Sequence, residues 1–185
     1  MPQLPRDGYY SRRPGSISDV IIHNTGGQED IQADNDYHRF KAVWDKDDPN
    51  VHAPHIAYHL WLPYDPVAFL SKHGLESDSI SPSVVVWCNH LWERSWHATN
   101  ANDVCVGIAL QLDGESQEPS EAQKTGVSWL IDEFLPDQGV VIPRKRVWGH
   151  GECSKVYGGG PDWGNNTVCP GKYVLPWVRE FRAKP

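Results

Sequence analysis

The 185-residue sequence has no apolar run near the ~20 residues that a membrane-spanning helix needs, and its start lacks the apolar core of a secretory signal. It has no basic excess either, because 17 Lys and Arg face 24 Asp and Glu, for a net charge of −7. These absences argue against an integral membrane protein, an exported chain and a nucleic-acid binder that follows phosphates. Internal repeats and low-complexity tracts are also missing, so we expect a single domain.

Cysteine is scarce, with four residues and no C-x-x-C pair, which disfavours zinc fingers and thioredoxin-like motifs. Four cysteines are too few for a disulfide scaffold at this length. Reduced thiols are therefore the expected state, although a Cys88–Cys105 bridge stays open because both lie in apolar, strand-like segments. Histidine and tryptophan, by contrast, are abundant at nine residues each, and composition alone does not say which of them matter.

Short apolar runs alternate with amphipathic stretches after an irregular N-terminal arm over residues 1–17. A capping box of Ser120 and Gln123 predicts the start of a helix that runs to about residue 134, and helical spacing predicts another over 174–181. Strands are predicted at 20–22, 56–62, 83–87, 104–112 and 147–148. This alternation predicts an α/β domain over residues 18–185, with a central mixed sheet flanked by helices.

His23 and His150 each follow an apolar strand-like run, and side chains at the ends of strands commonly form sites. Cys169 follows His150 by 19 residues. Two imidazoles and one thiolate would leave a fourth tetrahedral position open, which is the arrangement of a catalytic zinc rather than a structural one. Spacing alone leaves a core or capping role for each histidine open.

The order of several motifs along the chain gives this pattern more weight. They are I-I-H-N-T at 21–25, H-I-A-Y-H at 55–59, S-W-H-A at 95–98, Asn102, G-I-A-L at 107–110, G-H at 149–150 and T-V-C-P-G at 167–171. Over about residues 18–182 this series resembles the zinc-dependent N-acetylmuramoyl-L-alanine amidases. That superfamily includes phage amidase endolysins, which the chain resembles most, and the peptidoglycan recognition proteins.

The resemblance implies a Zn2+ ion held by His23, His150 and Cys169, and catalytic roles for Tyr58 and Thr167. Tyr58 falls where the family has a tyrosine beside the metal-bound water, as an orienting group or proton acceptor. Thr167 can donate to the tetrahedral oxyanion, more weakly than the lysine that phage enzymes often have there. A core tyrosine and a local turn hydroxyl are the structural alternatives for these two positions.

The resemblance also implies that His97, Asn102 and Trp96 bind substrate, with Trp96 stacking on sugar or peptide. His59 is expected to point away from Tyr58 on the opposite face of its strand and to be structural.

Two departures from the family pattern stand out. Ala109 occupies the position where wall-recycling relatives carry a catalytic Glu, so acid–base chemistry would have to come from elsewhere. The Gly-rich segment 151–168 is longer than in phage enzymes, and Cys153 within it is a competing candidate ligand.

The sequence therefore predicts a zinc amidase that cleaves the bond between N-acetylmuramic acid and L-alanine in peptidoglycan. As a phage endolysin it would stay in the host cytoplasm until holin-dependent release onto the cell wall. A monomer with no nucleic-acid or membrane partner is expected, with wall contacts from the cleft and from basic clusters at 12–13 and 144–146. The alternatives are a cytoplasmic wall-recycling amidase, a peptidoglycan-binding module without catalysis, and a Cys–His peptidase that uses Cys169 as nucleophile.

Overall fold

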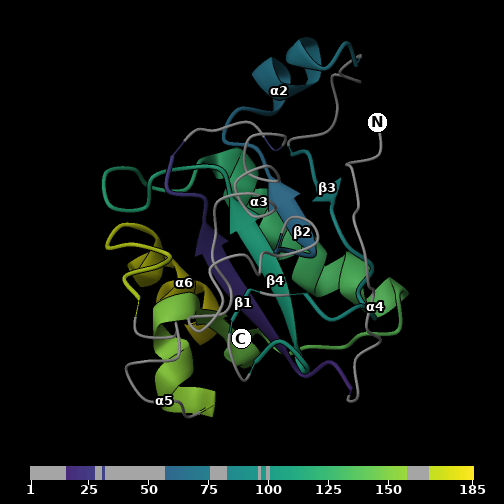
Figure 1. The fold of residues 1–185 in the computed structure, drawn as a ribbon, viewed down its shortest axis with the longest axis vertical. Coiled ribbons are helices and arrows are strands. Elements are labelled where there is room, and N and C mark those ends of the chain that lie inside the picture. The colour runs from purple at the N-terminus through teal and green to yellow at the C-terminus, as the bar shows by residue number, and fades with distance from the viewer. Residues whose placement is uncertain are drawn as a thin grey trace, which may run out of the picture.

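The computed structural model describes residues 16–27, 31, 57–75, 83–95, 97–98, 101–157 and 167–185. Its centre is a five-stranded sheet in the order β3-β2-β4-β1-β5 (Figure 1). The strands are β1 (Asp19–Asn24), β2 (Leu60–Leu62), β3 (Val86–Trp87), β4 (Cys105–Leu110) and β5 (Val147–Gly149). All neighbours pair in parallel except β2 and β3, which confirms the predicted mixed sheet.

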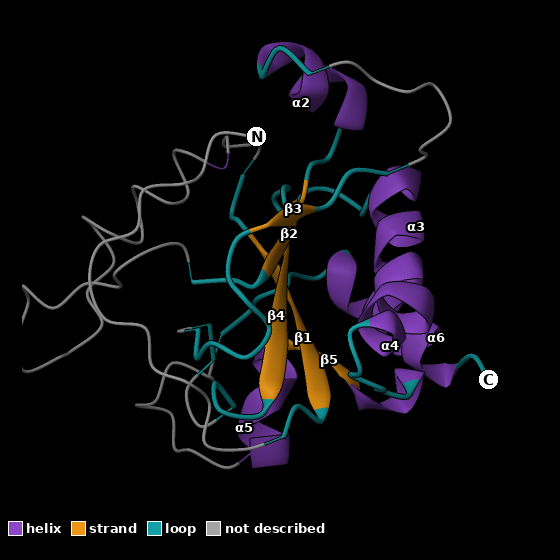
Figure 2. Cartoon of the chain, turned by 90° about the vertical axis from the view of Figure 1, so that its right-hand side faces the viewer, coloured by secondary structure: helices purple, strands orange, loops and turns teal. Residues whose placement is uncertain are grey.

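The helices lie mainly on one face of this sheet, where α3, α4 and α6 form a layer (Figure 2). The helical segments are α2 (Pro66–Lys72), α3 (Glu121–Trp129), the π-helical turn η1 (Leu130–Phe134), α4 (Leu135–Asp137), the 3-10 turns η2 (Arg144–Arg146) and η3 (His150–Glu152), α5 (Cys153–Tyr157) and α6 (Val174–Ala183). Ser120 caps α3 and the reciprocal bond from Gln123 completes the predicted capping box. The helix predicted near the C-terminus is likewise confirmed as α6.

Alternation along the strands gives the sheet two different faces. Val106, Ile108 and Leu110 of β4 belong to the main core together with residues of α3 and α6. Cys105, Gly107 and Ala109 point to the other face, where Cys105 and Ala109 join smaller clusters. This second face, which α3 and α6 do not cover, carries the buried histidines His23 and His97 (Figure 2).

The strand predicted at 56–62 is shorter in the structure. β2 begins at Leu60, and residue 56 lies outside the described residues. The reason is that the His59 imidazole, rather than a backbone carbonyl, accepts the Gly107 N–H at 2.9 Å, which replaces part of the ladder with a side-chain bond. Tyr58 and His59 therefore precede β2 instead of alternating within it, and His59 is fully buried and bonded to backbone groups, in agreement with the structural role predicted for it. Their rings both lie in the same histidine cluster, against His23 and His97 respectively.

Candidate functional site

The site lies at the carboxyl ends of two neighbouring parallel strands. His23 is the fifth residue of β1, and His150 is the first residue after β5. Because β1 and β5 pair in parallel, with Ile22 opposite Gly149, their ends meet at the same edge of the sheet. Cys169 reaches this edge from the segment that precedes α6, so three stretches far apart in sequence converge.

The potential ligand atoms of His23, His150 and Cys169 all lie within 4.8 Å of one another. The Cys169 Sγ lies 3.7 Å from the His23 Nδ1, and the two imidazole centroids are 4.5 Å apart. A tetrahedral zinc with ordinary Zn–N and Zn–S bonds separates a nitrogen and a sulfur ligand by about 3.6 Å. The donor set and this spacing thus fit a zinc ion with one position left for water or substrate.

Backbone contacts hold Cys169 in place. Its N–H donates to the Thr167 Oγ1 at 3.1 Å, and its carbonyl accepts from the Gly151 N–H at 2.6 Å. The turn after Cys169 packs against the loop that follows β4. In this turn Gly171 has a φ of +95° and lies against Gly114 of the loop. Sequence reasoning missed Gly114, and only the C-P-G context hinted that a tight turn follows the cysteine.

Glu152 links the segment that contains His150 to α6 through ion pairs. The Glu152 carboxylate accepts from the Gly149 N–H at 3.1 Å and pairs with Arg182 and Arg179 of α6 at 3.0 Å each. Burial alone would raise the pKa of Glu152, but the hydrogen bonds from Arg182, Gly149 and Arg179 outweigh it and hold the pKa below its ordinary value. The carboxylate therefore stays ionised and fixes the turn that follows β5.

Burial raises the pKa of the Cys169 thiol to about 12. A thiol in such surroundings is protonated at neutral pH, whereas a nucleophilic cysteine needs a lowered pKa. A raised pKa is the opposite of what the Cys–His peptidase alternative requires of Cys169. A metal ligand, by contrast, loses its proton to the incoming cation.

Cys153 does not join the ligand group. It is fully buried, its thiol donates to the Gly149 carbonyl at 3.8 Å, and it packs in an apolar cluster with Ile21 and Cys105. Burial also raises its pKa. The structure describes all four cysteines and none of them forms a disulfide, so Cys88 and Cys105 are not bonded to each other.

Tyr58 and Thr167 each contact one of the three potential ligands. The Tyr58 ring lies 5.1 Å from the His23 ring, and its side chain is 9% exposed. The Thr167 Oγ1 accepts the Cys169 N–H, which orients the oxygen and leaves the hydroxyl proton able to donate. Ala109 pairs with His23 in the β1–β4 register and brings no acid to this face. The catalytic roles of Tyr58 and Thr167 stay predictions.

The three residues predicted to bind substrate are placed differently. His97 is 4% exposed and lies behind His23, with its Nδ1 3.1 Å from the His23 Nε2. Asn102 is 7% exposed, and its Oδ1 accepts from the Ala98 N–H at 2.7 Å. Trp96 lies outside the described residues. The described contacts of His97 and Asn102 are made to protein, and their roles in substrate binding stay predictions.

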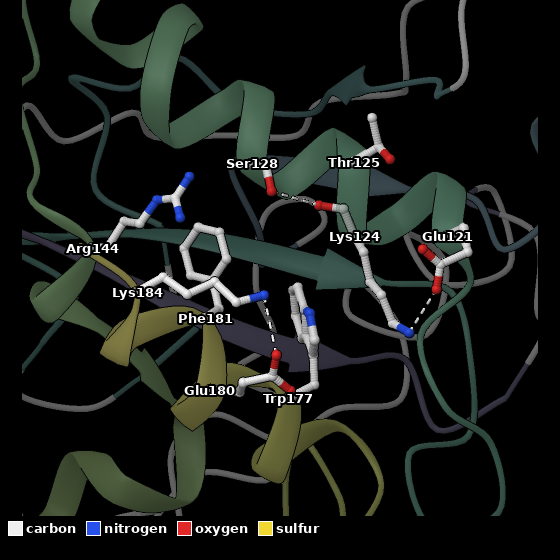
Figure 3. A pocket seen from close by; sticks show the side chains of 9 residues that line it. All are labelled: Glu121, Lys124, Thr125, Ser128, Arg144, Trp177, Glu180, Phe181 and Lys184. Atoms are coloured by element: carbon white, nitrogen blue, oxygen red, sulfur yellow. Dashed lines mark hydrogen bonds and ion pairs between the residues drawn. The ribbon is translucent and has the colours of Figure 1, made fainter.

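A hollow of about 500 Å3 lies on the opposite side of the sheet, between α3 and α6 (Figure 3). Trp177 and Phe181 line it together with cations that already have acidic partners: Lys124 pairs with Glu121, Lys184 with Glu180, and Arg144 with Asp132. Paired cations offer little net charge to an anionic polymer. Arg146 is paired with Asp19, and residues 12–13 lie outside the described residues, so wall contacts from the basic clusters stay a prediction.

No helix among the described residues is both long and apolar enough to cross a membrane.

Several solved structures share the fold at low sequence identity. Drosophila PGRP-LB is 18% identical with a TM-score of 0.64, and the match covers 95% of this chain and 86% of that one. The N-acetylmuramoyl-L-alanine amidase LysC from Clostridium intestinale is 16% identical with a TM-score of 0.62, covering 96% and 90%. The Ph2119 endolysin of a Thermus scotoductus bacteriophage is 20% identical with a TM-score of 0.60, covering 96% and 92%.

A comparison with curated protein sequences finds no significant match. The family model of N-acetylmuramoyl-L-alanine amidases, however, matches residues 13–172. That range contains most of the chain, including β1, β4, β5 and all three residues whose ligand atoms converge. The chain therefore belongs to the N-acetylmuramoyl-L-alanine amidase family.

Proposed function

We propose that this protein is a zinc-dependent amidase that hydrolyses the bond between the lactyl group of N-acetylmuramic acid and L-alanine in peptidoglycan. The observation that carries the proposal is the convergence of His23, His150 and Cys169 within 4.8 Å beside Tyr58. When bound, zinc supplies a Lewis acid and lowers the pKa of a water ligand to about 7. Family membership supports the choice of substrate bond.

The chain's own groups would do the remaining work. The Tyr58 phenol lies against the His23 ring, where it can orient a nucleophilic water and pass a proton through its hydroxyl. The Thr167 hydroxyl, fixed by the Cys169 N–H, can donate to the oxygen that becomes negative as the amide carbon turns tetrahedral. Since Thr167 is neutral, we expect it to contribute less than a lysine would at the same place.

The decisive experiment is metal analysis of the purified chain, followed by mass spectrometry of the products released from purified peptidoglycan. We expect about one zinc per chain and fragments that end in a free L-alanine amine. Cys169→Ala should lose zinc and activity together, because it removes the only sulfur ligand. Cys153→Ala is the matched control, since it removes the thiol of a cysteine that bonds the Gly149 carbonyl and lies outside the ligand group. Full activity in Cys169→Ala, or in chelator-treated protein, would refute the proposal.

We further propose bacterial lysis by a bacteriophage as the biological setting, with peptidoglycan as the partner of a monomeric enzyme that is released from the host cytoplasm to the wall. The likeness to the Ph2119 endolysin, which the chain matches over 92% of that protein's length, supports this setting. Expression in a bacterial host should cause lysis only when the inner membrane is permeabilised. Lysis without permeabilisation, or none with it, would contradict the endolysin role.

A binding module without catalysis is the second candidate. The fold is shared with peptidoglycan recognition proteins, one of them solved in complex with tracheal cytotoxin, a monomeric diaminopimelic acid-type peptidoglycan. A zinc-loaded chain that sediments with peptidoglycan but releases no product would support this candidate over the amidase.

A further inference from the structure

A line of hydrogen bonds runs from His23 away from the ligand cluster into the protein. The His23 Nε2 lies 3.1 Å from the His97 Nδ1, and the His97 Nε2 lies 3.3 Å from the carbonyl oxygen of Cys105 in β4. His23 and His97 are 2% and 4% exposed, so both bonds are formed away from solvent.

The Cys105 carbonyl at the end of this line determines which imidazole nitrogens carry a proton. A carbonyl oxygen only accepts, so the His97 Nε2 must carry the proton of that bond. A buried imidazole is favoured in its neutral form, in which the other nitrogen, Nδ1, is an acceptor. The His23 Nε2 must then be the donor of the second bond. It follows that the His23 Nδ1, which lies 3.7 Å from the Cys169 Sγ, holds a lone pair that points into the cluster.

We propose that His97 is a positioning residue that holds His23 in its Nε2–H tautomer, with the Nδ1 lone pair directed toward Cys169 and His150. The proposal rests on the metal site proposed above, because a histidine ligand must be neutral and must present a lone pair to the cation. It assigns His97 to the support of a ligand rather than to contact with substrate.

Gly107 supplies an independent observation. A Cβ added to Gly107 would lie 2.6 Å from the His97 Cγ and 2.9 Å from its Nδ1, so the His97 ring occupies the space of a missing side chain. The Gly107 N–H also donates to the His59 Nδ1, and the His59 ring lies 5.6 Å from the His97 ring. The strand thus leaves room for the His97 imidazole, and a second buried imidazole lies beside it.

The first test reads the tautomers of the metal-free protein from long-range ¹H–¹⁵N spectra of its imidazoles. We expect the Nε2–H form for both His23 and His97, and a mixed population for His23 in His97→Leu. A merely structural role for His97 would leave the His23 tautomer unchanged. A wild-type His23 protonated on Nδ1 would overturn the proposal without any variant having to fold.

The second test measures zinc affinity by competition with a chromophoric chelator. His97→Leu should bind zinc roughly 10- to 100-fold more weakly, as loss of a hydrogen-bond partner of a ligand usually does. His97→Asn should recover most of this loss, because its side-chain oxygen can take the place of the Nδ1 acceptor. Gly107→Ala should weaken binding in the same direction by displacing the ring.

Gln123→Leu is the control for loss of a buried polar side chain. Gln123 is fully buried on the other face of the sheet, where its amide donates to the Leu62 carbonyl at 3.1 Å. It should lower thermal stability and leave zinc affinity unchanged. Zinc binding by His97→Leu within about twofold of wild type would refute the role of His97 alone. A wild-type chain that binds no zinc would refute the metal site and this role together.

Discussion

Gly114→Ala places a methyl group where the loop after β4 meets the segment that carries Cys169. The added Cβ would lie 1.8 Å from the Pro170 carbonyl oxygen and 2.7 Å from the Asn24 Nδ2. Real Cβ atoms essentially never approach other atoms closer than 3.0 Å, so the carbonyl is more than 1 Å too close. Because this neighbour is backbone rather than a flexible side chain, the segment itself must move.

The movement has two consequences of different size. Overpacking of this kind costs about 1–3 kcal/mol of unfolding free energy. The metal site is more sensitive, since ligand distances must stay within about 0.2 Å of their ordinary values. A four-ligand zinc site is worth about 10–16 kcal/mol, or roughly 3 kcal/mol per ligand. Displacing Cys169 by about 1 Å should therefore weaken zinc binding by roughly 100-fold.

The assay is zinc competition alongside urea unfolding, with Gly139→Ala as the matched control. Gly139 has a φ of +77° and no atom within 4 Å of an added Cβ. Its substitution should cost about 1–2 kcal/mol through backbone strain and leave zinc affinity unchanged. Equal zinc affinity in Gly114→Ala and Gly139→Ala would show that the close contact at Gly114 does not position Cys169.

Three further predictions concern the surrounding fold. Gly126→Ala in α3 should destabilise the protein in urea unfolding, because the added Cβ would lie 2.3 Å from the Ser83 Oγ and 2.6 Å from the Cδ2 of the fully buried Leu62. Overpacking of about 1–3 kcal/mol at this contact exceeds the helix-propensity gain of about 1 kcal/mol. A more stable variant would contradict this. Ser120→Ala removes the cap of α3 and should cost about 1 kcal/mol in the same assay. Ser116→Ala should raise the pKa of Asp113 toward its ordinary value in a carboxylate NMR titration, because the Ser116 hydroxyl is the main cause that lowers it. Because folding lowers this pKa, the stability that Asp113 contributes is present above its unfolded-state pKa and is lost as the pH falls through its folded-state pKa. Ser116→Ala should therefore lose less unfolding free energy than the wild type when the pH is lowered through this range.

The elements that could be predicted from sequence are those in which one local pattern decides the outcome. β4 reads as an unbroken apolar run because both its faces are buried, and α3 begins at its capping box. α2 went unpredicted although its start carries a signal, since Asp65 caps it and Pro66 occupies its first position. The late start of β2 at Leu60 could not be predicted, because it depends on the His59 ring, whose partner Gly107 is 48 residues away.

Some residues of the candidate site could likewise be predicted from local sequence patterns, and others could not. His23 and His150 could be proposed because each follows a strand-like run, Cys169 because it supplies a thiolate 19 residues after His150, and the resemblance gave this set more weight. The position of His97 behind His23 could not be predicted, since that contact joins residues 74 positions apart and leaves no periodic pattern. Gly114 was invisible for a similar reason, because its lack of a side chain matters only once Pro170 lies against it.

The difference between the two faces of β4 limits the chemistry available at this site. Toward α3 and α6 the strand presents Val106, Ile108 and Leu110, which fill the main core. Toward the histidines it presents Cys105, Gly107 and Ala109, and the missing side chain at 107 is what makes room for an imidazole. A strand built of such small residues can position ligands, but it supplies no carboxylate to accept a proton. Proton transfer in the proposed reaction must therefore use groups off the strand, and among the described residues Tyr58, whose ring lies against His23, and Thr167, whose hydroxyl bonds the Cys169 N–H, are our candidates.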